Sequence, residues 1–394
     1  MIKTFNHEEP DRVLIHHRGF VPNGTFYHDW METVAEDLND DQVDIVPHIG
    51  DQTMFSWCGQ DTVFGGIPVV VGYPNVDLLD AIDDWDDHPV LRDLKHVDDL
   101  SNLRVSWCGH VKETTTHNNM SYTWYHTGLF KTKEIRKDFY ERFGNPFDEK
   151  FRPGEKYVKQ FRKKLQALEE IDYRKIMVAQ TGSFWENSFE GFSLGGISRL
   201  MRKDPAFVDK LYADYYKINK HAWELILEAA DGFEPIIVGT ASDLGQKERP
   251  LINPKLWRRF IKPHYKKLMD LAHKKGAFTW QHSCGFMEPL LPDLIDAGLD
   301  AVQSLEPAAG VDLARVKENH GDDIVLVGGI DSTNTLSFGS VEDVVADVKK
   351  CLKVGMPGGG YIAGTSHRII DCPIKNVRAM VETLEEFGTY PCRL

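Results

Sequence analysis

The sequence is poor in cysteine and has no long apolar run. Its six cysteines in 394 residues do not have the spacing of a disulfide framework: Cys58, Cys108, Cys284, Cys351, Cys372 and Cys392. No uncharged apolar stretch approaches the roughly 18 residues that a membrane helix needs. Residues 1–11 also lack the apolar core of a signal peptide. These absences predict a cytoplasmic protein with free thiols and no membrane partner.

Positive charge is also scarce. The chain has 46 Lys and Arg residues against 60 Asp and Glu residues, so its formal net charge is −14. Nucleic-acid binding depends mainly on cations that meet phosphates, so this balance argues against a nucleic-acid partner. The hydrophobic share of 42% and the charged share of 27% are ordinary for a globular protein. The length suits one large α/β barrel.

The second half of the chain alternates short apolar runs with helical patterns. We expect strands at 235–239, 277–282, 300–305, 323–330 and 360–364, and helices at 254–275, 289–297, 312–319, 341–354 and 375–387. Strands that alternate with helices pair in parallel, which predicts a (β/α)₈ TIM barrel. The main rival is an open doubly wound sheet, but the chain has no clear G-x-G-x-x-G phosphate loop.

The first half is less regular. Strand-like runs occur at 11–16, 43–47, 67–72, 122–125 and 175–180, with a helical stretch at 160–175. No linker composition interrupts the chain. We therefore predict a single domain over 1–394, in which 1–150 is an irregular N-terminal elaboration and 175–390 holds the regular βα units.

The motif His282-Ser283-Cys284-Gly285 follows the strand expected at 277–282. Residues two apart on a strand point to the same face, so His282 and Cys284 project together at the carboxyl end of that strand. Barrel active sites are built at this end. Imidazole and thiolate are good zinc ligands. The alternative is a hydrogen-bonded histidine beside an inert core cysteine.

Other polar residues follow neighbouring strands. His367 stands at the end of the last expected strand, and Cys372 lies five residues later. Either could complete a zinc site that keeps one position open for substrate, or His367 could bind substrate instead. Asp243 and Glu306 follow two other strands, where carboxylates serve as ligands, orienting groups or proton carriers. The alternative for both is a helix N-cap.

The order and spacing of several motifs resemble the uroporphyrinogen decarboxylase superfamily over about residues 195–390. The motifs are Asp243-Leu244-Gly245, His282-x-Cys284-Gly285, Glu306-Pro307-x-x-Gly310-x-Asp312, Gly328-Gly329-Ile330-Asp331 and Ser366-His367. Members of that family fold as (β/α)₈ barrels. Its decarboxylases carry an arginine-rich N-terminal segment, whereas the corresponding stretch here, residues 16–20, has one arginine. A substrate with many carboxylates needs more cations than that.

The resemblance is closer to the other branch, the zinc-dependent methyltransferases that work with corrinoid proteins. The His-x-Cys pair of that branch carries over to His282 and Cys284. Its third ligand, a cysteine in the last strand-end loop, falls near His367 by position and suggests Cys372 by residue type. The resemblance thus implies His282, Cys284 and Cys372 as metal ligands, with Asp243, Glu306 and His367 as catalytic residues.

The implied reaction moves a methyl group from a methoxylated small molecule to the cobalt of a corrinoid (cobalamin) protein, with zinc as a Lewis acid on the ether oxygen. Asp243 or Glu306 would orient a ligand or handle the phenol proton. Aromatic residues in the N-terminal region favour an aromatic substrate; they include Phe20, Phe26, Tyr27, Trp30, Phe55, Trp57, Tyr122, Trp124 and Tyr125. The alternatives are a corrinoid-to-thiol (coenzyme M) methyltransferase, a metal-free decarboxylase, and a non-catalytic corrinoid- or tetrapyrrole-binding barrel.

Overall fold

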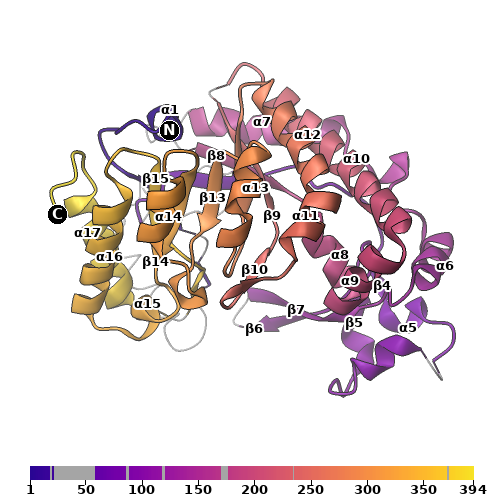
Figure 1. The fold of residues 1–394 in the computed structure, drawn as a ribbon. Coiled ribbons are helices and arrows are strands. Elements are labelled where there is room, and N and C mark those ends of the chain that lie inside the picture. Colours follow the sequence, from indigo (N-terminus) through magenta and orange to yellow (C-terminus); the bar gives the residue numbers. More distant parts are fainter. Residues whose placement is uncertain are drawn as a thin grey trace.

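The computed structural model describes residues 1–17, 20–21, 58–85, 88–117, 120–169, 176–233, 235–370 and 372–394. Eight strands form its central sheet: β1 (Leu14–Ile15), β3 (Thr62–Gly65), β8 (Ile176–Thr181), β9 (Ile237–Ala241), β12 (Phe278–His282), β13 (Ala301–Ser304), β14 (Val325–Ile330) and β15 (Tyr361–Thr365). They pair in the order β1-β15-β14-β13-β12-β9-β8-β3, and every pair is parallel. Neighbours in this sheet follow one another along the chain, as in a (β/α)₈ barrel. The predicted fold class is therefore confirmed (Figure 1).

The two edge strands, β1 and β3, meet at a seam that closes the barrel. The Asp61 amide donates to the Ile15 carbonyl oxygen over 2.9 Å, and the Ile15 amide donates to Asp61 Oδ2 over 2.8 Å. The His17 amide donates to Gln60 Oε1 over 2.9 Å. Arg12 donates to both oxygens of Asp61. The seam is thus held largely by side chains, because β1 is two residues long and has no ladder with β3.

The inside of the barrel is a packed core. Alternate residues of the strands point inward, and they form one buried cluster: Phe5, Val178, Ile237, Trp280, Ala301, Val325, Val327 and Ile362. Phe5 comes from helix α1 (Ile2–Phe5) and lies with its ring centroid 4.4 Å from that of Phe278. Since Phe278 begins β12, α1 fills the amino end of the barrel and leaves the carboxyl end for the polar residues.

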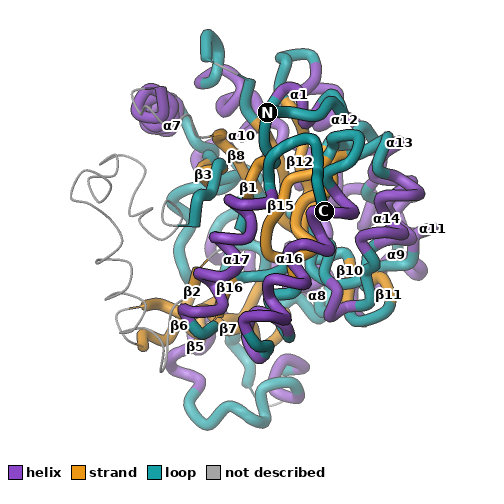
Figure 2. The backbone as a smooth tube through the Cα atoms, turned by 90° about the vertical axis from the view of Figure 1, so that its left-hand side faces the viewer, coloured by secondary structure: helices purple, strands orange, loops and turns teal. Residues whose placement is uncertain are grey.

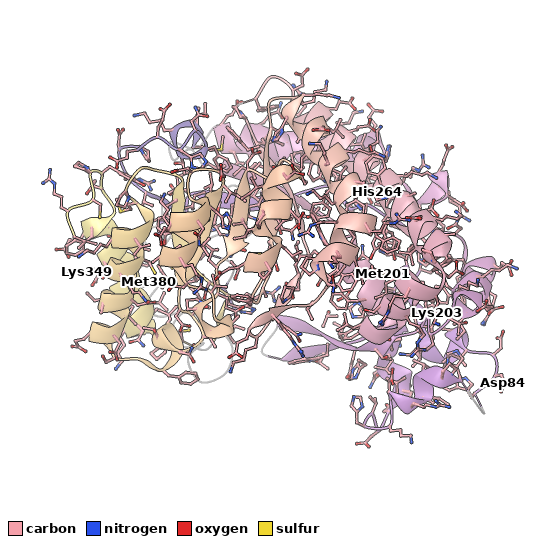
Figure 3. The ribbon with its side chains drawn as sticks, viewed as in Figure 1. Asp84, Met201, Lys203, His264, Lys349 and Met380 are labelled. Carbon is pink, nitrogen blue, oxygen red and sulfur yellow. The ribbon has the colours of Figure 1, made fainter. Side chains whose placement is uncertain are left out.

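Helices surround the sheet (Figure 2). They are α7 (Glu155–Glu169), α8 (Trp185–Phe192), α9 (Leu194–Lys203), α10 (Pro205–Ala229), α11 (Pro254–Phe260), α12 (Lys262–His273), α13 (Leu291–Asp296), α14 (Leu313–His320), α15 (Thr335–Phe338), α16 (Val341–Gly355) and α17 (Ile374–Phe387). Their apolar faces pack on the outside of the strands in a second, larger core that includes Met201 and Met380. Lys203, on the same helix as Met201, is exposed (Figure 3). No described helix has both the length and the hydropathy to cross a membrane.

The N-terminal elaboration contains a four-stranded antiparallel sheet in the order β4 (Val76–Asp77), β5 (Leu103–Val105), β6 (His110–His117) and β7 (Met120–Gly128). Helix α5 (Leu78–Ala81) lies between β4 and β5 along the chain, and helix α6 (Lys133–Phe143) follows β7. Short pairs β10 (Gly245–Gln246) with β11 (Arg249–Pro250), and β2 (Phe20–Val21) with β16 (Ile369–Ile370), complete the strands. In Figure 1 this sheet lies below the barrel, at the end where β9 leads into β10.

Two details differ from the sequence predictions. The helix expected at 254–275 is broken at Ile261 into α11 and α12, because Pro263 has no amide proton to continue the helical ladder and restricts the residue before it. The strand expected at 67–72 is absent. The strand in this region is β3, which ends at Gly65. Gly66 has φ +152° and Pro68 cannot donate to a ladder, so the buried Ile67 and Val69 pack from a loop. The strand expected at 43–47 lies outside the described residues.

Burial of His17 beside the seam makes stability depend on pH. Burial lowers the pKa of His17 from 6.5 to about 4. A histidine whose pKa is lower in the folded chain contributes stability that is present above pH 6.5 and is lost as the pH falls toward 4. We expect His17 to lower the free energy of unfolding by about 2 kcal/mol between pH 7.5 and pH 5. Urea titrations at both pH values would measure this, and His17→Asn should flatten the dependence. An unchanged dependence in that variant would contradict the assignment.

Candidate active site

Polar residues gather at the carboxyl ends of β9, β12 and β13. His282 is the last residue of β12 and pairs in register with Ala241 of β9. Cys284 and Asp243 each stand two residues further along their strands' directions, so they fall beside each other. Glu306 follows β13 in the same way. The register of the parallel sheet thus brings together four residues from three strands that are far apart in sequence.

His282, Cys284 and Asp243 form a compact cluster. Cys284 Sγ lies 3.4 Å from His282 Nε2, and His282 Nε2 lies 3.9 Å from Asp243 Oδ1. One potential ligand atom from each residue lies within 4.8 Å of the other two. Within the ranges that the structure describes, no other set of three His, Cys, Asp or Glu residues meets this condition.

The cluster fits a zinc ion. Zinc bonds of 2.0–2.3 Å in tetrahedral geometry place ligand atoms about 3.5 Å apart, close to the 3.4 and 3.9 Å observed. Imidazole, thiolate and carboxylate are all zinc ligands. The His282 side chain is 5% exposed and that of Asp243 is 37% exposed, so one side of the cluster faces solvent. A zinc ion held by these three residues would therefore keep one coordination position open to solvent.

Gln303 on β13 fixes the orientation of His282. The two residues are register partners, and His282 Nδ1 donates to Gln303 Oε1. Because a carbonyl oxygen only accepts, the imidazole proton sits on Nδ1 and the lone pair of Nε2 faces Cys284 and Asp243. This is the arrangement that supports a metal-binding histidine. Gln303 is not among the site residues predicted from the sequence, although a glutamine inside an apolar strand, one strand away from His282, is a usable signal.

The turn after β12 is held by the two carboxylates. Asp243 Oδ1 accepts from the Cys284 amide over 2.9 Å, and Glu306 Oε2 accepts from the Gly285 amide over 2.8 Å. Gly285 has φ +79°, and a Cβ there would lie 2.3 Å from the backbone carbon of Gly245. The turn therefore requires glycine. Glu306 stands at the N-cap position of the short 3₁₀ helix Pro307–Ala309, but its carboxylate makes no capping hydrogen bond, and Asp243 precedes strand β10.

His367 and Cys372 lie in the loop after β15. The His367 amide donates to Ser332 Oγ over 3.0 Å. The buried Cys372 thiol lies 3.2 Å from Ser337 Oγ, and it also donates to the Ile370 carbonyl oxygen. The third member of the cluster is Asp243, whereas the sequence predicted Cys372 as the third ligand. Cys372 as a ligand, and Asp243, Glu306 and His367 as catalytic residues, stay predictions.

We expect Gln303→Leu to weaken zinc binding about 10- to 100-fold, because the imidazole loses the acceptor that fixes its tautomer and orientation. Competition with a zinc chelator would measure the affinity. Gln303→Glu keeps an acceptor oxygen at the same place and serves as the matched variant, with affinity close to that of the unchanged protein. Equal affinities in Gln303→Leu and the unchanged protein would show that Gln303 does not support the site.

Fold and site together define a (β/α)₈-barrel protein with a candidate metal centre at its carboxyl mouth. Residues 240–387 match the family described as Uroporphyrinogen decarboxylase (URO-D). This segment contains Asp243, His282, Cys284, Gln303 and Glu306. The resemblance to the uroporphyrinogen decarboxylase superfamily is therefore confirmed over this segment.

Two named relatives and one solved structure that resemble the chain are described as methyltransferases. The chain is 28% identical over 177 residues to a protein named methylcobamide:CoM methyltransferase MtaA from Methanosarcina barkeri, and 27% identical to its counterpart from strain Fusaro. Each match covers 43% of this chain and 49% of the relative, so the chain spans about half the length of these relatives. A solved methyltransferase from Methanosarcina mazei matches 98% of this chain and 97% of its own, with a TM-score of 0.60 and 17% identity. That likeness shows the fold.

Proposed function

We propose that the protein is a zinc-dependent methyltransferase that works with a corrinoid-binding protein. The observation that carries the proposal is the cluster of His282, Cys284 and Asp243 at the barrel mouth. The family match over residues 240–387 and the methyltransferase names of the relatives support it. The match covers only about half the length of the named relatives, so it does not by itself assign their activity, substrates or partner to this chain.

His282 and Cys284 hold the zinc ion in this proposal, with Asp243 or Cys372 as the third ligand. A bound zinc ion supplies Lewis acidity to the oxygen of a methoxylated, aromatic substrate. The reduced cobalt of the partner's corrinoid would be the acceptor of the methyl group. We favour a methoxylated substrate because its phenolate oxygen needs stabilisation once the methyl group has left. The cluster and the nearby Glu306 supply that stabilisation.

The chain's own residues orient the site and move the proton. Gln303 holds His282, and Asp243 and Glu306 hold the backbone of the Cys284–Gly285 turn. Glu306 Oε2 accepts from the Gly285 amide. In this proposal Glu306 Oε1 faces the phenolate oxygen of the product and donates a proton to it. His367, from the loop after β15, binds the substrate.

A second candidate is methyl transfer from a corrinoid to a thiol. The printed names of the two Methanosarcina barkeri relatives favour it. The same three residues serve in this reaction, since bound zinc lowers the pKa of a coordinated thiol. The substrate then becomes a thiolate acceptor in place of a methoxylated donor.

Metal analysis followed by two methyl-transfer assays tests the proposal. We expect about one zinc per chain in protein purified without added metal. One assay supplies a reduced corrinoid protein with methoxylated aromatics, and the other supplies a methylated corrinoid with thiols. Zinc-dependent transfer in the first assay supports the leading candidate, and transfer only in the second supports the thiol reaction. Full activity after chelation would refute the zinc site, and carbon dioxide release without methyl transfer would indicate a decarboxylase. Asp243→Asn and Cys372→Ser, compared for zinc content, identify the third ligand.

A further inference from the structure

Three buried N–H donors inside the barrel have no hydrogen-bond partner among the described residues. They are the amide nitrogens of Gln180 and Gln303 and the indole nitrogen of Trp280. Buried donors in folded proteins are nearly always paired, since an unpaired one loses its bond to water and gains nothing in return. Three such donors on strands of the same barrel, β8, β12 and β13, call for a ligand.

The strand periodicity places these donors at the candidate site. Val178, Trp280 and Ala301 belong to the cluster that fills the barrel. Residues two further along a strand share the same face. Gln180 therefore follows Val178, His282 follows Trp280, and Gln303 follows Ala301 on the inward side, each toward the carboxyl end. Gln180 is partly exposed although its amide nitrogen is buried, so it stands where the interior opens toward solvent.

A neighbouring glutamine shows what a purely structural amide looks like in this chain. Gln281 points to the opposite side of β12 from His282 and is fully buried. Its Oε1 accepts from Tyr265 over 2.7 Å, and its Nε2 donates to the Ser242 carbonyl oxygen over 3.0 Å. Both the oxygen and the nitrogen of the Gln281 amide thus have hydrogen-bond partners, whereas the amide nitrogens of Gln180 and Gln303 have none among the described residues.

We propose that the side-chain amides of Gln180 and Gln303 bind a second oxygen of the substrate, next to the methoxyl that reacts. This inference rests on the proposed function. Because Gln303 Oε1 is taken by His282 Nδ1, its remaining group toward the site is a donor. Amide donors select an oxygen acceptor, and the carboxylates of Asp243 and Glu306 disfavour an additional anion there. The substrate class is a methoxylated compound with a neutral ether or carbonyl oxygen beside the reacting methoxyl.

Direct binding of two simple probes tests this. 1,2-Dimethoxybenzene carries the second oxygen, and methoxybenzene lacks it. By titration calorimetry we expect the unchanged protein to bind the first about tenfold more tightly than the second. Gln180→Leu should bring this ratio close to one by weakening only 1,2-dimethoxybenzene. Its melting temperature should equal or exceed that of the unchanged protein, because the substitution removes an unpaired buried donor.

Three further variants keep the test decisive. Gln180→Glu has the same size and offers an acceptor instead of a donor, so it should lose the preference as fully as Gln180→Leu. Gln303→Leu should lose it too, and Gln281→Leu should lower the melting temperature while keeping the ratio. No preference in the unchanged protein, or an undiminished preference in both Gln180 variants, would overturn the inference. Binding requires no methyl transfer, so the donor site can be confirmed or refuted whether or not the proposed function holds.

Discussion

Cys284→Ala is expected to lose bound zinc and to transfer methyl groups at least about a thousandfold more slowly than the unchanged protein. The thiolate is the softest of the three ligands in the cluster and lies 3.4 Å from His282 Nε2. Without it the cluster keeps two potential ligands, which is too few for a stable zinc site. Lewis-acid activation contributes several kcal/mol to such reactions, which corresponds to this loss of rate. Zinc content and the rate of methyl transfer would be measured on the same preparation.

Cys392→Ala is the matched control for that variant. Cys392 is also partly exposed, but it lies near the C-terminus, where its thiol donates to the Leu352 carbonyl oxygen. We expect it to keep both its zinc and its rate. If Cys284→Ala retained a full complement of zinc, or lost zinc without losing activity, the role proposed for the cluster would be wrong.

Asp61→Ala is expected to lower the free energy of unfolding by about 3 kcal/mol. The Asp61 carboxylate is 6% exposed and accepts from both the Arg12 guanidinium and the Ile15 amide. Removing it leaves the Ile15 amide without its acceptor at the seam between β1 and β3. The Arg12 side chain is 48% exposed, so water takes over part of its charge, and the loss lies at the low end of that for a broken buried ion pair. Urea denaturation followed by circular dichroism would measure it.

Asp11→Ala provides the comparison, because it removes the same charge one residue from Arg12. The Asp11 side chain is fully exposed and lies 3.9 Å from Lys3. We expect a change within about 0.5 kcal/mol. Equal and small effects of the two substitutions would mean that the seam does not depend on Asp61.

The sequence predicted the regular half of the barrel well. The five C-terminal strands are apolar and separated by clear helical patterns, so their order along the chain leads to parallel pairing. The same reasoning placed His282 and Cys284 on one face at the end of β12, where the structure finds them 3.4 Å apart. Pro263 indicates a break in the helix near Ile261, but the helix predicted over 254–275 did not take that proline into account.

The other half was harder to predict, for physical reasons. β1 has two residues and β3 has four, so neither has enough length to show a periodic pattern. The seam is made by side-chain bonds of Asp61 and Gln60, which no pattern of hydrophobicity reveals. The place of Asp243 beside His282 depends on the register between β9 and β12, which only the folded sheet defines. Five of the aromatic residues expected to wall a pocket, from Phe26 to Trp57, lie outside the described residues.

Helix α1 has a consequence for the order in which reactants bind. Phe5 is 7% exposed and fills the amino end of the barrel against Phe278, whereas the cluster opens at the carboxyl end. Under the proposed function, the small molecule and the macromolecule that exchanges the methyl group therefore share one opening. The small molecule has to be seated before the larger partner covers the mouth, and the product leaves only after the partner departs. Under the proposed function, a helix of four residues at the amino end of the barrel thus imposes a compulsory order on the two reactants at the carboxyl end.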